Sequence, residues 1–311
     1  MADGVRSGGR RRHATPSTEE TDGRRGPTSI DLHTHTSRSD GILTPEALVR
    51  AAADCGVRLL AVTDHDTLAG VRDVIAAGAV PAGLVLVPGV EINAIVPRDL
   101  GLTEGELHVL GIGVDPDDDA FEAVLAGQRA ERRRRFARTV IRLRELGLSI
   151  DSQLDDAPGS DPDDSLGRPT VARALIRAGH ATSVEDAFSR LLAWGRPAYI
   201  ARTGLGPVEA IAAIRAAGGL ASLAHFAEAS PRTDVIRALQ DVGLDGLEVY
   251  YRSFDVATTD AVAGVARDLG LAPTGGTDYH GDVDAYAEAN ARLFVPPDVA
   301  DGIPLDTSVV G

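Results

Sequence analysis

The chain has 311 residues, one cysteine and a formal net charge of −15, and all 31 of its basic residues are arginine. A single cysteine excludes disulfide frameworks and thiolate metal clusters, and the absence of lysine excludes P-loop, Schiff-base and pyridoxal-phosphate enzymes, each of which needs one. The negative charge argues against binding of long duplex nucleic acid, which requires a positive surface, and favours a small substrate.

Residues 1–27 are rich in Arg, Gly, Ser, Thr and Pro and contain almost no apolar side chains. Such a segment cannot bury enough surface to order itself, so we expect a disordered tail. Neither the tail nor any later stretch has an apolar run long enough for a secretory signal or a membrane span. These observations predict a cytoplasmic protein that does not contact membranes.

From residue 28 onward, short apolar runs alternate with helical periodicity, which is typical of βα units. The clearest helix has Thr44 as its N-cap and Pro45 in its first turn, and it stops at Gly56. We therefore expect an α/β protein. The predicted strands are residues 29–32, 59–63, 84–87, 107–112, 220–224, 246–249 and 271–274.

Strand signals are missing from residues 115–205, where the sequence instead predicts a long arginine-rich helix over about 121–146 and two shorter helices. An irregular stretch rich in Asp and Pro, residues 151–169, separates them. We interpret residues 115–205 as a helical insertion, or cap domain. The core would comprise residues 28–114 and 206–300, followed by a C-terminal tail at 301–311.

Histidines and carboxylates follow nearly every predicted strand. The first such motif is Asp31-Leu-His33-Thr-His35, in which the two histidines project to the same side of an extended segment and can face one ion. Loops beyond the carboxyl ends of strands converge in α/β folds, so these side chains are expected to meet in one metal-binding cluster. The other residues of this kind are Asp40, Asp64, His65, Asp66, Glu91, His108, His225, Asp278 and His280.

The motifs, in this order, resemble those of the polymerase-and-histidinol-phosphatase (PHP) superfamily. They are His-x-His with a downstream Asp, Thr-Asp-His-Asp, Gly-Val-Glu-Ile, His-Val-Leu-Gly-Ile, Leu-Ala-His and Gly-Thr-Asp-Tyr-His-Gly, spread between residue 29 and about residue 297. The resemblance implies a distorted (β/α)7-type barrel and a metal-dependent phosphoesterase. The insertion is similar to that of the branch acting on nucleoside 3′,5′-bisphosphates and on the 5′ ends of short RNA.

The resemblance also implies three metal sites, with Glu91 bridging two of them. The ligands would be His33, His35, Glu91 and Asp278 in one site, Asp40, His65 and His280 in another, and Glu91, His108 and His225 in the third. This nitrogen and oxygen set suits two or three divalent ions, with Mn²⁺ expected first and Fe²⁺ or Zn²⁺ remaining open. Asp64 and Asp66 are expected to support ligands or cap loops.

Two positions depart from the family pattern. Thr170 replaces a histidine that often follows Gly-Arg-Pro, and Phe226 replaces the proline that usually follows the ligand equivalent to His225. Thr170 can supply a hydroxyl but not a titrating imidazole, and the loss of proline removes a backbone restraint. We expect His225 to remain a ligand.

Arginine must bind the substrate phosphate in a chain without lysine, and it does so with paired hydrogen bonds. Arg168, Arg132 and Arg135 are the candidates, with Thr170 beside them, although the arginines of the long helix could equally form a solvated face paired with glutamates. Arg196 and Tyr199 are weaker candidates.

A small phosphorylated substrate, a nucleotide above all, would be hydrolysed by a metal-activated water, so no protein nucleophile is required. Three alternatives remain open. The enzyme could act on histidinol phosphate, it could be an amidohydrolase, or it could be a catalytically silent metal-binding module of the same family. Amidohydrolases often bridge their metals with a carboxylated lysine, which this chain lacks.

Overall fold

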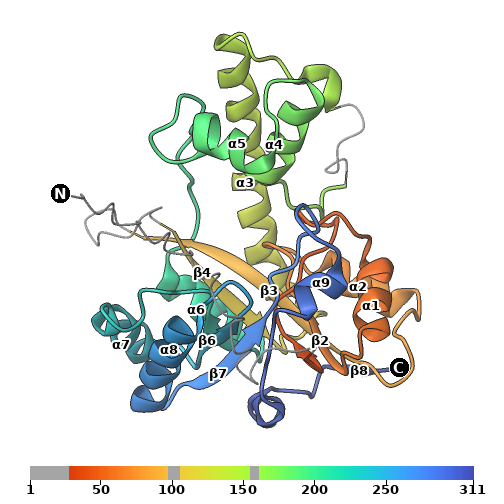
Figure 1. Ribbon diagram of the computed structural model, residues 1–311, viewed down its shortest axis with the longest axis vertical. Coiled ribbons are helices and arrows are strands. Elements are labelled where there is room, and N and C mark those ends of the chain that lie inside the picture. The colour runs from red at the N-terminus through yellow and green to blue at the C-terminus, as the bar shows by residue number, and fades with distance from the viewer. Residues whose placement is uncertain (1–27, 97–105, 155–160) are drawn as a thin grey trace, which may run out of the picture.

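The computed structural model describes residues 28–96, 106–154 and 161–311; the predicted tail at 1–27 lies outside these residues. Seven strands follow one another around a nearly closed barrel in the order β1-β2-β3-β4-β5-β6-β7 (Figure 1), which confirms the expected fold. They are β1 (Ile30–Asp31), β2 (Leu59–Val62), β3 (Val85–Ile95), β4 (Glu106–Ile112), β5 (Leu220–Leu223), β6 (Gly246–Tyr251) and β7 (Ala272–Gly276).

The barrel closes between its first and last strands. The backbone N–H of Leu32, just after β1, donates to the carbonyl of Gly275 in β7 at 3.0 Å. This approach requires glycine at position 276, where an added Cβ would lie 2.4 Å from the Cβ of His33. The close contact sets the first histidine of the His-x-His motif directly against β7.

All seven predicted strands are present, but two differ from the expected βα pattern. β3 continues to Ile95, so Glu91 lies within a strand rather than after it, and β4 runs antiparallel to both β3 and β5. The reason is the short connection of residues 96–105, because a parallel crossover needs a dozen or more residues. His108 consequently lies near the beginning of its strand.

Helices cover the outside of the barrel. The first, α1 (Pro45–Asp54), has the predicted N-cap, since the Thr44 hydroxyl accepts from the N–H of Ala47. The residues expected to form a C-terminal tail include β8 (Val309–Val310), which pairs antiparallel with β3. The other helices around the barrel are α2 (Ala69–Ala76), α6 (Pro207–Ala216), α7 (Thr233–Asp241), α8 (Val256–Leu269), α9 (Tyr286–Asn290) and a 3-10 helix (Pro297–Gly302).

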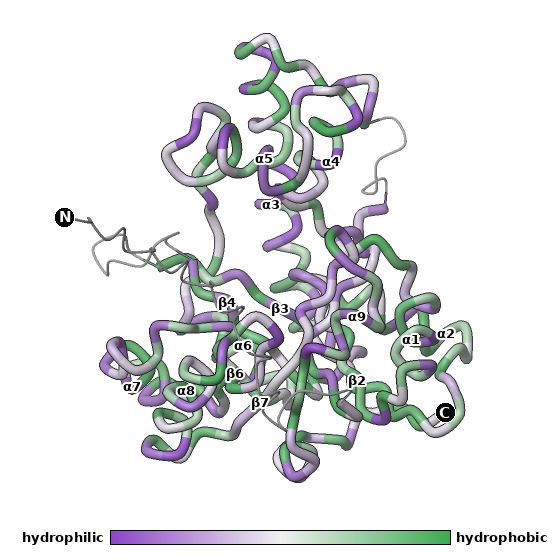
Figure 2. Tube along the Cα trace, in the orientation of Figure 1, coloured by the Kyte–Doolittle hydropathy of each residue, from purple (hydrophilic) through white to green (hydrophobic). Residues whose placement is uncertain are grey.

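The helical region stands above one end of the barrel (Figure 1). Its long helix α3 (Asp119–Glu145) begins against the barrel, where Leu125 packs into the main core, and its far end packs Leu143 into a separate core. Hydrophilic residues are frequent along α3 between these two cores (Figure 2). The remaining elements of this region are a 3-10 helix (Asp151–Gln153), α4 (Arg168–Arg177), α5 (Val184–Ala187) and a π-helical turn (Phe188–Leu192).

Charged side chains join the helical region to the loop that contains Asp40. Arg38 donates to Asp161 at 2.9 Å and to Asp164 at 3.0 Å, both of which precede α4. From α4, Arg173 donates to the backbone carbonyl of Asp40 at 2.5 Å. The helical region is thereby tied to the barrel beside Asp40.

Candidate metal centre

Nine side chains, from six of the strands and the loops that follow them, meet at the end of the barrel that faces the helical region. They form three groups in which the potential ligand atoms lie within 4.8 Å of one another. One group holds His33, His35, Glu91 and Asp278, another holds His35, Asp40, His65 and His280, and the third holds Glu91, His108 and His225. These groups coincide with the sets expected from the resemblance, except that His35 belongs to two of them.

Glu91 lies at the centre of the arrangement. One carboxylate oxygen, Oε1, is 3.5 Å from His33 Nε2, 2.7 Å from His108 Nδ1 and 3.3 Å from His225 Nε2. The other, Oε2, is 3.3 Å from His35 Nε2 and 2.9 Å from His65 Nδ1. A single carboxylate therefore contacts all three groups, as expected of a bridging ligand.

The remaining carboxylates, Asp40 and Asp278, each lie within 4 Å of three histidines. Asp40 Oδ2 is 3.4 Å from His65 Nε2, and Oδ1 is 3.1 Å from His280 Nε2. Asp278 Oδ1 is 3.4 Å from His33 Nε2 and 3.2 Å from His35 Nε2. The alternation of carboxylate and imidazole places at least one ring nitrogen of each of these histidines within 4 Å of an anionic oxygen.

The residues fit a set of cations. Several of the buried nitrogens and oxygens, among them His33 Nε2, both ring nitrogens of His35 and Glu91 Oε2, have no hydrogen-bond partner within the described residues. Burial alone would raise the pKa of the Glu91 carboxyl, but the charges of His65, His108 and His33 hold that pKa well below its usual range. Burial lowers the pKa of His33, whereas Glu248, Asp278 and Glu91 raise it well above its usual range. This is a site that favours positive charge.

The backbone is distorted at the same place. Of the described residues other than glycine, only Asp66, His225 and Asp278 have positive φ, with angles of 53°, 33° and 48°. All three lie in the loops that carry the ligands. Positive φ is uncommon for residues other than glycine, although Asp and His adopt it more readily than most, and residues in this conformation cluster at functional sites.

Glu248 is a site residue that the sequence analysis missed. It lies in β6, is fully buried, and accepts from His33 Nδ1 at 3.0 Å and from the backbone N–H of His225 at 2.7 Å. Its two oxygens thus orient two candidate ligands from different strands, and the bond to Nδ1 leaves Nε2 of His33 free to bind a metal. A lone acidic residue in an apolar strand was the only signal available in the sequence.

Asp64 and Asp66 support loops. Asp64 accepts from the N–H and hydroxyl of Thr36, each at 2.7 Å, and from the hydroxyl of Ser39 at 2.6 Å, which fixes the loop leading to Asp40. Asp66 instead accepts from two arginines, Arg132 and Arg202. Both carboxylates are buried, so each of these bonds is shielded from water.

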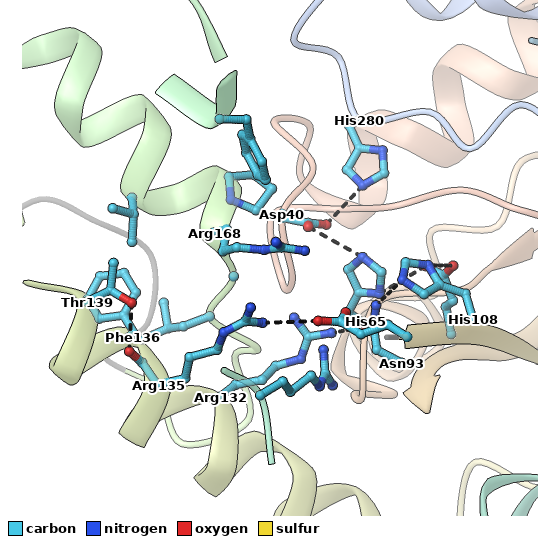
Figure 3. A pocket seen from close by; sticks show the side chains of 18 of the residues that line it. Asp40, His65, Asn93, His108, Arg132, Arg135, Phe136, Thr139, Arg168 and His280 are labelled. Carbon is cyan, nitrogen blue, oxygen red and sulfur yellow. Dashed lines mark hydrogen bonds and ion pairs between the residues drawn. The ribbon is translucent and has the colours of Figure 1, made fainter. Parts of the chain in front are cut away.

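A cavity of about 200 Å³ opens beside the cluster and is walled on the cap side by arginines (Figure 3). Arg132, Arg135 and Arg168, predicted from the sequence, line it together with Arg202, which was not predicted. Burial and the nearby charge of Arg168 lower the pKa of Arg135 to about 10. Burial and the charge of Arg132 likewise lower the pKa of Arg202 to about 10. Glu106 lines the same cavity, 3.6 Å from Arg135 Nη1, and relieves only part of the repulsion among these cations, so a further anion would be stabilised here.

The arginines of this wall differ in how far they are engaged. Arg132 donates from Nε to Asp66 and from Nη2 to the amide oxygen of Asn93. The amide nitrogen of Asn93 in turn contacts His108. Arg135 donates from Nε to the carbonyl of Ile200, while its Nη2 has no partner within the described residues, and the same is true of Arg202 Nε. Arg135 and Arg202 are therefore better placed than Arg132 to bind an anion.

The other sequence candidates lie further from the cavity. Thr170 is buried in α4 and is not among the lining residues, although its hydroxyl lacks a partner within the described residues. Tyr199 packs its ring 5.8 Å from the Arg135 guanidinium, and Arg196 is exposed. Their roles in substrate binding stay predictions.

A family profile described as "PHP domain" matches residues 31–148 of the chain. Over 276 residues the chain is 31% identical to the 5′-3′ exoribonuclease Rnm of Escherichia coli K12, an alignment that covers 86% of this chain and 90% of that protein. The chain belongs to the PHP family. This PHP protein is also 29% identical over 279 residues to the 3′,5′-nucleoside bisphosphate phosphatase of Chromobacterium violaceum, covering 86% of this chain and 93% of that one.

The solved structures agree with this assignment. A Bifidobacterium adolescentis protein assigned as a metal-dependent phosphoesterase superimposes on this PHP protein with a TM-score of 0.77 and 30% identity. The superposition covers 90% of this chain and 96% of the other. The protein is accordingly a metal-dependent phosphoesterase, which is a hydrolase. Within the described residues no helix combines the length and the apolar character needed to cross a bilayer.

Proposed function

We propose that this PHP phosphoesterase removes the 3′ phosphate from a nucleoside 3′,5′-bisphosphate and that the same site can act at the 5′ ends of short RNA. Two or three divalent ions, Mn²⁺ first, would be held by the three groups around Glu91. The support for a nucleotide substrate is that the candidate metal ligands and a group of arginines line one cavity. The protein would work on small molecules and chain ends rather than on long duplexes.

The observation that carries the proposal is the arginine wall opposite the metal ligands. Asp40, His65, Glu91 and Asp278 line the same cavity as Arg135, Arg168 and Arg202. A substrate with one phosphate would need only the cluster. Two phosphates, one against the cluster and one against the arginines, would use both sides of the cavity, which is the charge pattern of a bisphosphate.

The chemistry divides between the ions and the chain. When bound, divalent ions would activate water as the attacking group and neutralise charge on the phosphoryl oxygens. The chain orients the ligands: Glu248 fixes the ring of His33, and Asp64 fixes the loop that carries Asp40. Arg135 and Arg202 would hold the second phosphate and so position the scissile one, and the cap limits access to a mononucleotide or a chain end.

The relatives support this substrate class. The Chromobacterium violaceum relative is a 3′,5′-nucleoside bisphosphate phosphatase and the Escherichia coli one a 5′-3′ exoribonuclease, and both match this chain over most of its length. The two substrates share a ribose with phosphates on either side. A single cavity with two anion subsites can accommodate that unit in either molecule.

The test is phosphate release by the Mn²⁺-loaded protein from adenosine 3′,5′-bisphosphate, compared with adenosine 3′-monophosphate and ribose 5-phosphate. A charge-assisted hydrogen bond contributes about 1.5–3 kcal/mol, so kcat/KM for the bisphosphate should exceed that for the monophosphate by roughly 10- to 150-fold. Arg135→Gln should remove most of that preference. Arg138→Gln, an exposed arginine of the same helix, should preserve it.

Turnover of ribose 5-phosphate with none of either nucleotide would contradict the substrate assignment. Equal kcat/KM for the bisphosphate and the monophosphate in the unmodified protein would contradict the role of the arginine wall. A histidinol phosphate assay run beside these substrates tests the main alternative.

A further inference from the structure

The cavity beside the metal ligands has an apolar end, which neither phosphate of the proposed substrate would occupy. Five of the residues that line the cavity come from the helical region and carry apolar side chains: Phe136, Leu166, Pro169, Val171 and Phe188. We call these five residues the apolar end. Phe136, Val171 and Phe188 also pack into the separate core of the helical region, so the cap holds this end of the cavity in place.

One face of α3 runs from the metal ligands to the apolar end. Phe136 and Thr139 follow Arg132 by four and seven residues, so all three project to the same side of the helix, and all three line the cavity. Arg132 reaches Asp66, whereas Phe136 packs against the cap core. Figure 3 shows Phe136 and Thr139 on the far side of the arginines from His65. Four residues of helix rise by about 6 Å, and the ribose of one nucleotide separates a phosphate from the base by a comparable distance.

A second connection runs through the beginning of α4. A Cβ built on Gly167 would lie 3.4 Å from Asp40 Oδ2, so the backbone here lies against a candidate metal ligand. The next residue, Arg168, places its guanidinium carbon 5.3 Å from the centre of the Phe188 ring. The arginine wall and the aromatic surface therefore adjoin within a single cavity.

The apolar end provides flat surfaces for stacking. Phe136 and Phe188 are both half-buried, so part of each side chain remains accessible from the cavity. The Thr139 hydroxyl on the same face of α3 is already engaged, because it donates to the carbonyl of Arg135 at 2.9 Å. Such a surface suits a nucleobase, since every base has a flat face that stacks on aromatic side chains whatever its pattern of hydrogen-bonding groups.

We propose that the base of the substrate nucleotide stacks on Phe188 and Phe136 while its phosphates face the metal ligands and the arginine wall. The inference rests on the proposed function and deepens it, because it assigns a site to the uncharged part of the substrate. All parts of the nucleotide then lie in one cavity. The barrel supplies the metal ligands and the cap supplies the contacts to the base.

The test compares adenosine 3′,5′-bisphosphate with 1,4-anhydroribitol 3,5-bisphosphate, which keeps the sugar ring and both phosphates but has no base. Loss of base stacking on alanine substitution converts to about a 5- to 150-fold change in binding. Phe188→Ala should lower the ratio of the two kcat/KM values, adenosine compound over abasic compound, by that factor. Phe188→Leu and Phe136→Leu keep an apolar side chain against the cap core and should lower the ratio by a smaller factor.

The ratio distinguishes base binding from a structural effect. Because Phe188 also contacts Arg168, a disturbed arginine wall would lower kcat/KM for both compounds equally and leave the ratio unchanged. Phe294→Ala is the matched control, since Phe294 is 38% exposed, follows α9 and does not line this cavity. It should leave the ratio as it is in the unmodified protein.

Three results would overturn the proposal. The first is a ratio within about twofold of one in the unmodified protein. The second is a ratio that stays unchanged in the variants of Phe188 and Phe136. The third is an equal fall of the ratio in Phe294→Ala, which would show that the effect is not local to the apolar end.

A binding measurement separates this inference from the proposed reaction. Adenosine has no phosphate and Zn²⁺ has no unpaired electrons, so saturation-transfer NMR of the Zn²⁺-loaded protein with adenosine reports base binding without turnover. Adenosine should bind the unmodified protein and bind more weakly to Phe188→Leu. No binding at millimolar adenosine, or equal binding to both proteins, would refute the base site. Weakened binding to Phe188→Leu together with hydrolysis of neither bisphosphate would support the base site and place the error in the proposed reaction.

Discussion

Replacing Glu248 by glutamine changes one oxygen to an amide nitrogen and keeps the shape of the side chain. The carboxylate accepts two hydrogen bonds, from His33 Nδ1 at 3.0 Å and from the backbone N–H of His225 at 2.7 Å. Glutamine has one acceptor oxygen, so in either orientation its NH₂ group faces one of these two donors. One candidate metal ligand must then lose its orienting partner.

The size of the effect follows from burial. Glu248 is fully buried, so a donor left unpaired there costs about 1–3 kcal/mol of folding free energy. Loss of a group that orients a metal ligand typically weakens metal binding by about 10- to 100-fold. The weakening should affect the groups that contain His33 and His225. The group of His35, Asp40, His65 and His280 does not contact Glu248 and should keep its affinity.

Isothermal titration of the metal-free protein with Mn²⁺ measures these affinities, and urea unfolding in chelator measures the stability. Glu122→Gln is a matched control, because Glu122 also accepts with both oxygens, from Arg72 and Arg129, but contacts no candidate ligand. It should lose stability while its Mn²⁺ affinities stay unchanged. Mn²⁺ binding to Glu248→Gln within twofold of the unmodified protein at every site would refute this reasoning.

Three further results are expected. Chelation should lower the thermal midpoint and added Mn²⁺ should restore it, because a site at 100 times its Kd contributes about 2.7 kcal/mol; a midpoint insensitive to both would mean that the cluster binds no ion. Arg173→Ala should lower the free energy of unfolding in urea by about 2 kcal/mol and reduce kcat/KM, because Arg173 contacts both the Asp40 carbonyl and Asp282. Arg177→Ala loses only one exposed contact, to Gln153, and should change neither quantity. Gly276→Ala should destabilise the fold by about 1–3 kcal/mol, because the new Cβ would clash with His33. Gly264→Ala in α8, where the new Cβ meets nothing nearer than 3.8 Å, should stabilise the fold by about 0.5–1 kcal/mol. Equal effects of the two substitutions in calorimetry would contradict the packing argument.

The seven strands could be predicted because each carries a local apolar pattern, and the ligand motifs because they follow those strands directly. The direction of β4 could not be derived from its own residues, since it depends on the length of the connection before it. His108 was therefore found as a candidate, but its place near the beginning of a reversed strand was not. Local patterns fix where a strand lies in the sequence, and the connections decide which way it runs.

Glu248 and Arg202 were missed for a different reason. Glu248 contacts His33, which is 215 positions away, and Arg202 contacts Asp66, which is 136 positions away. Neither residue belongs to a motif, and a single charge in a strand or a loop is compatible with many surroundings. Residues that support a ligand through one distant contact become identifiable only when the fold brings the two segments together.

Phe226 shows how such a distant contact can replace a local restraint. The family pattern has proline after this ligand, and its absence predicted a less restrained backbone at His225. In the structure His225 has a φ of 33°, and its N–H is bound by Glu248 at 2.7 Å, while the following turn closes through the N–H of Ala227 to the carbonyl of His225 at 3.1 Å. Phe226 packs partly buried against the barrel core. Because Glu248 also orients His33, the conformation at His225 depends on β6 rather than on the residue that follows it, so two ligands of different groups are positioned by one carboxylate.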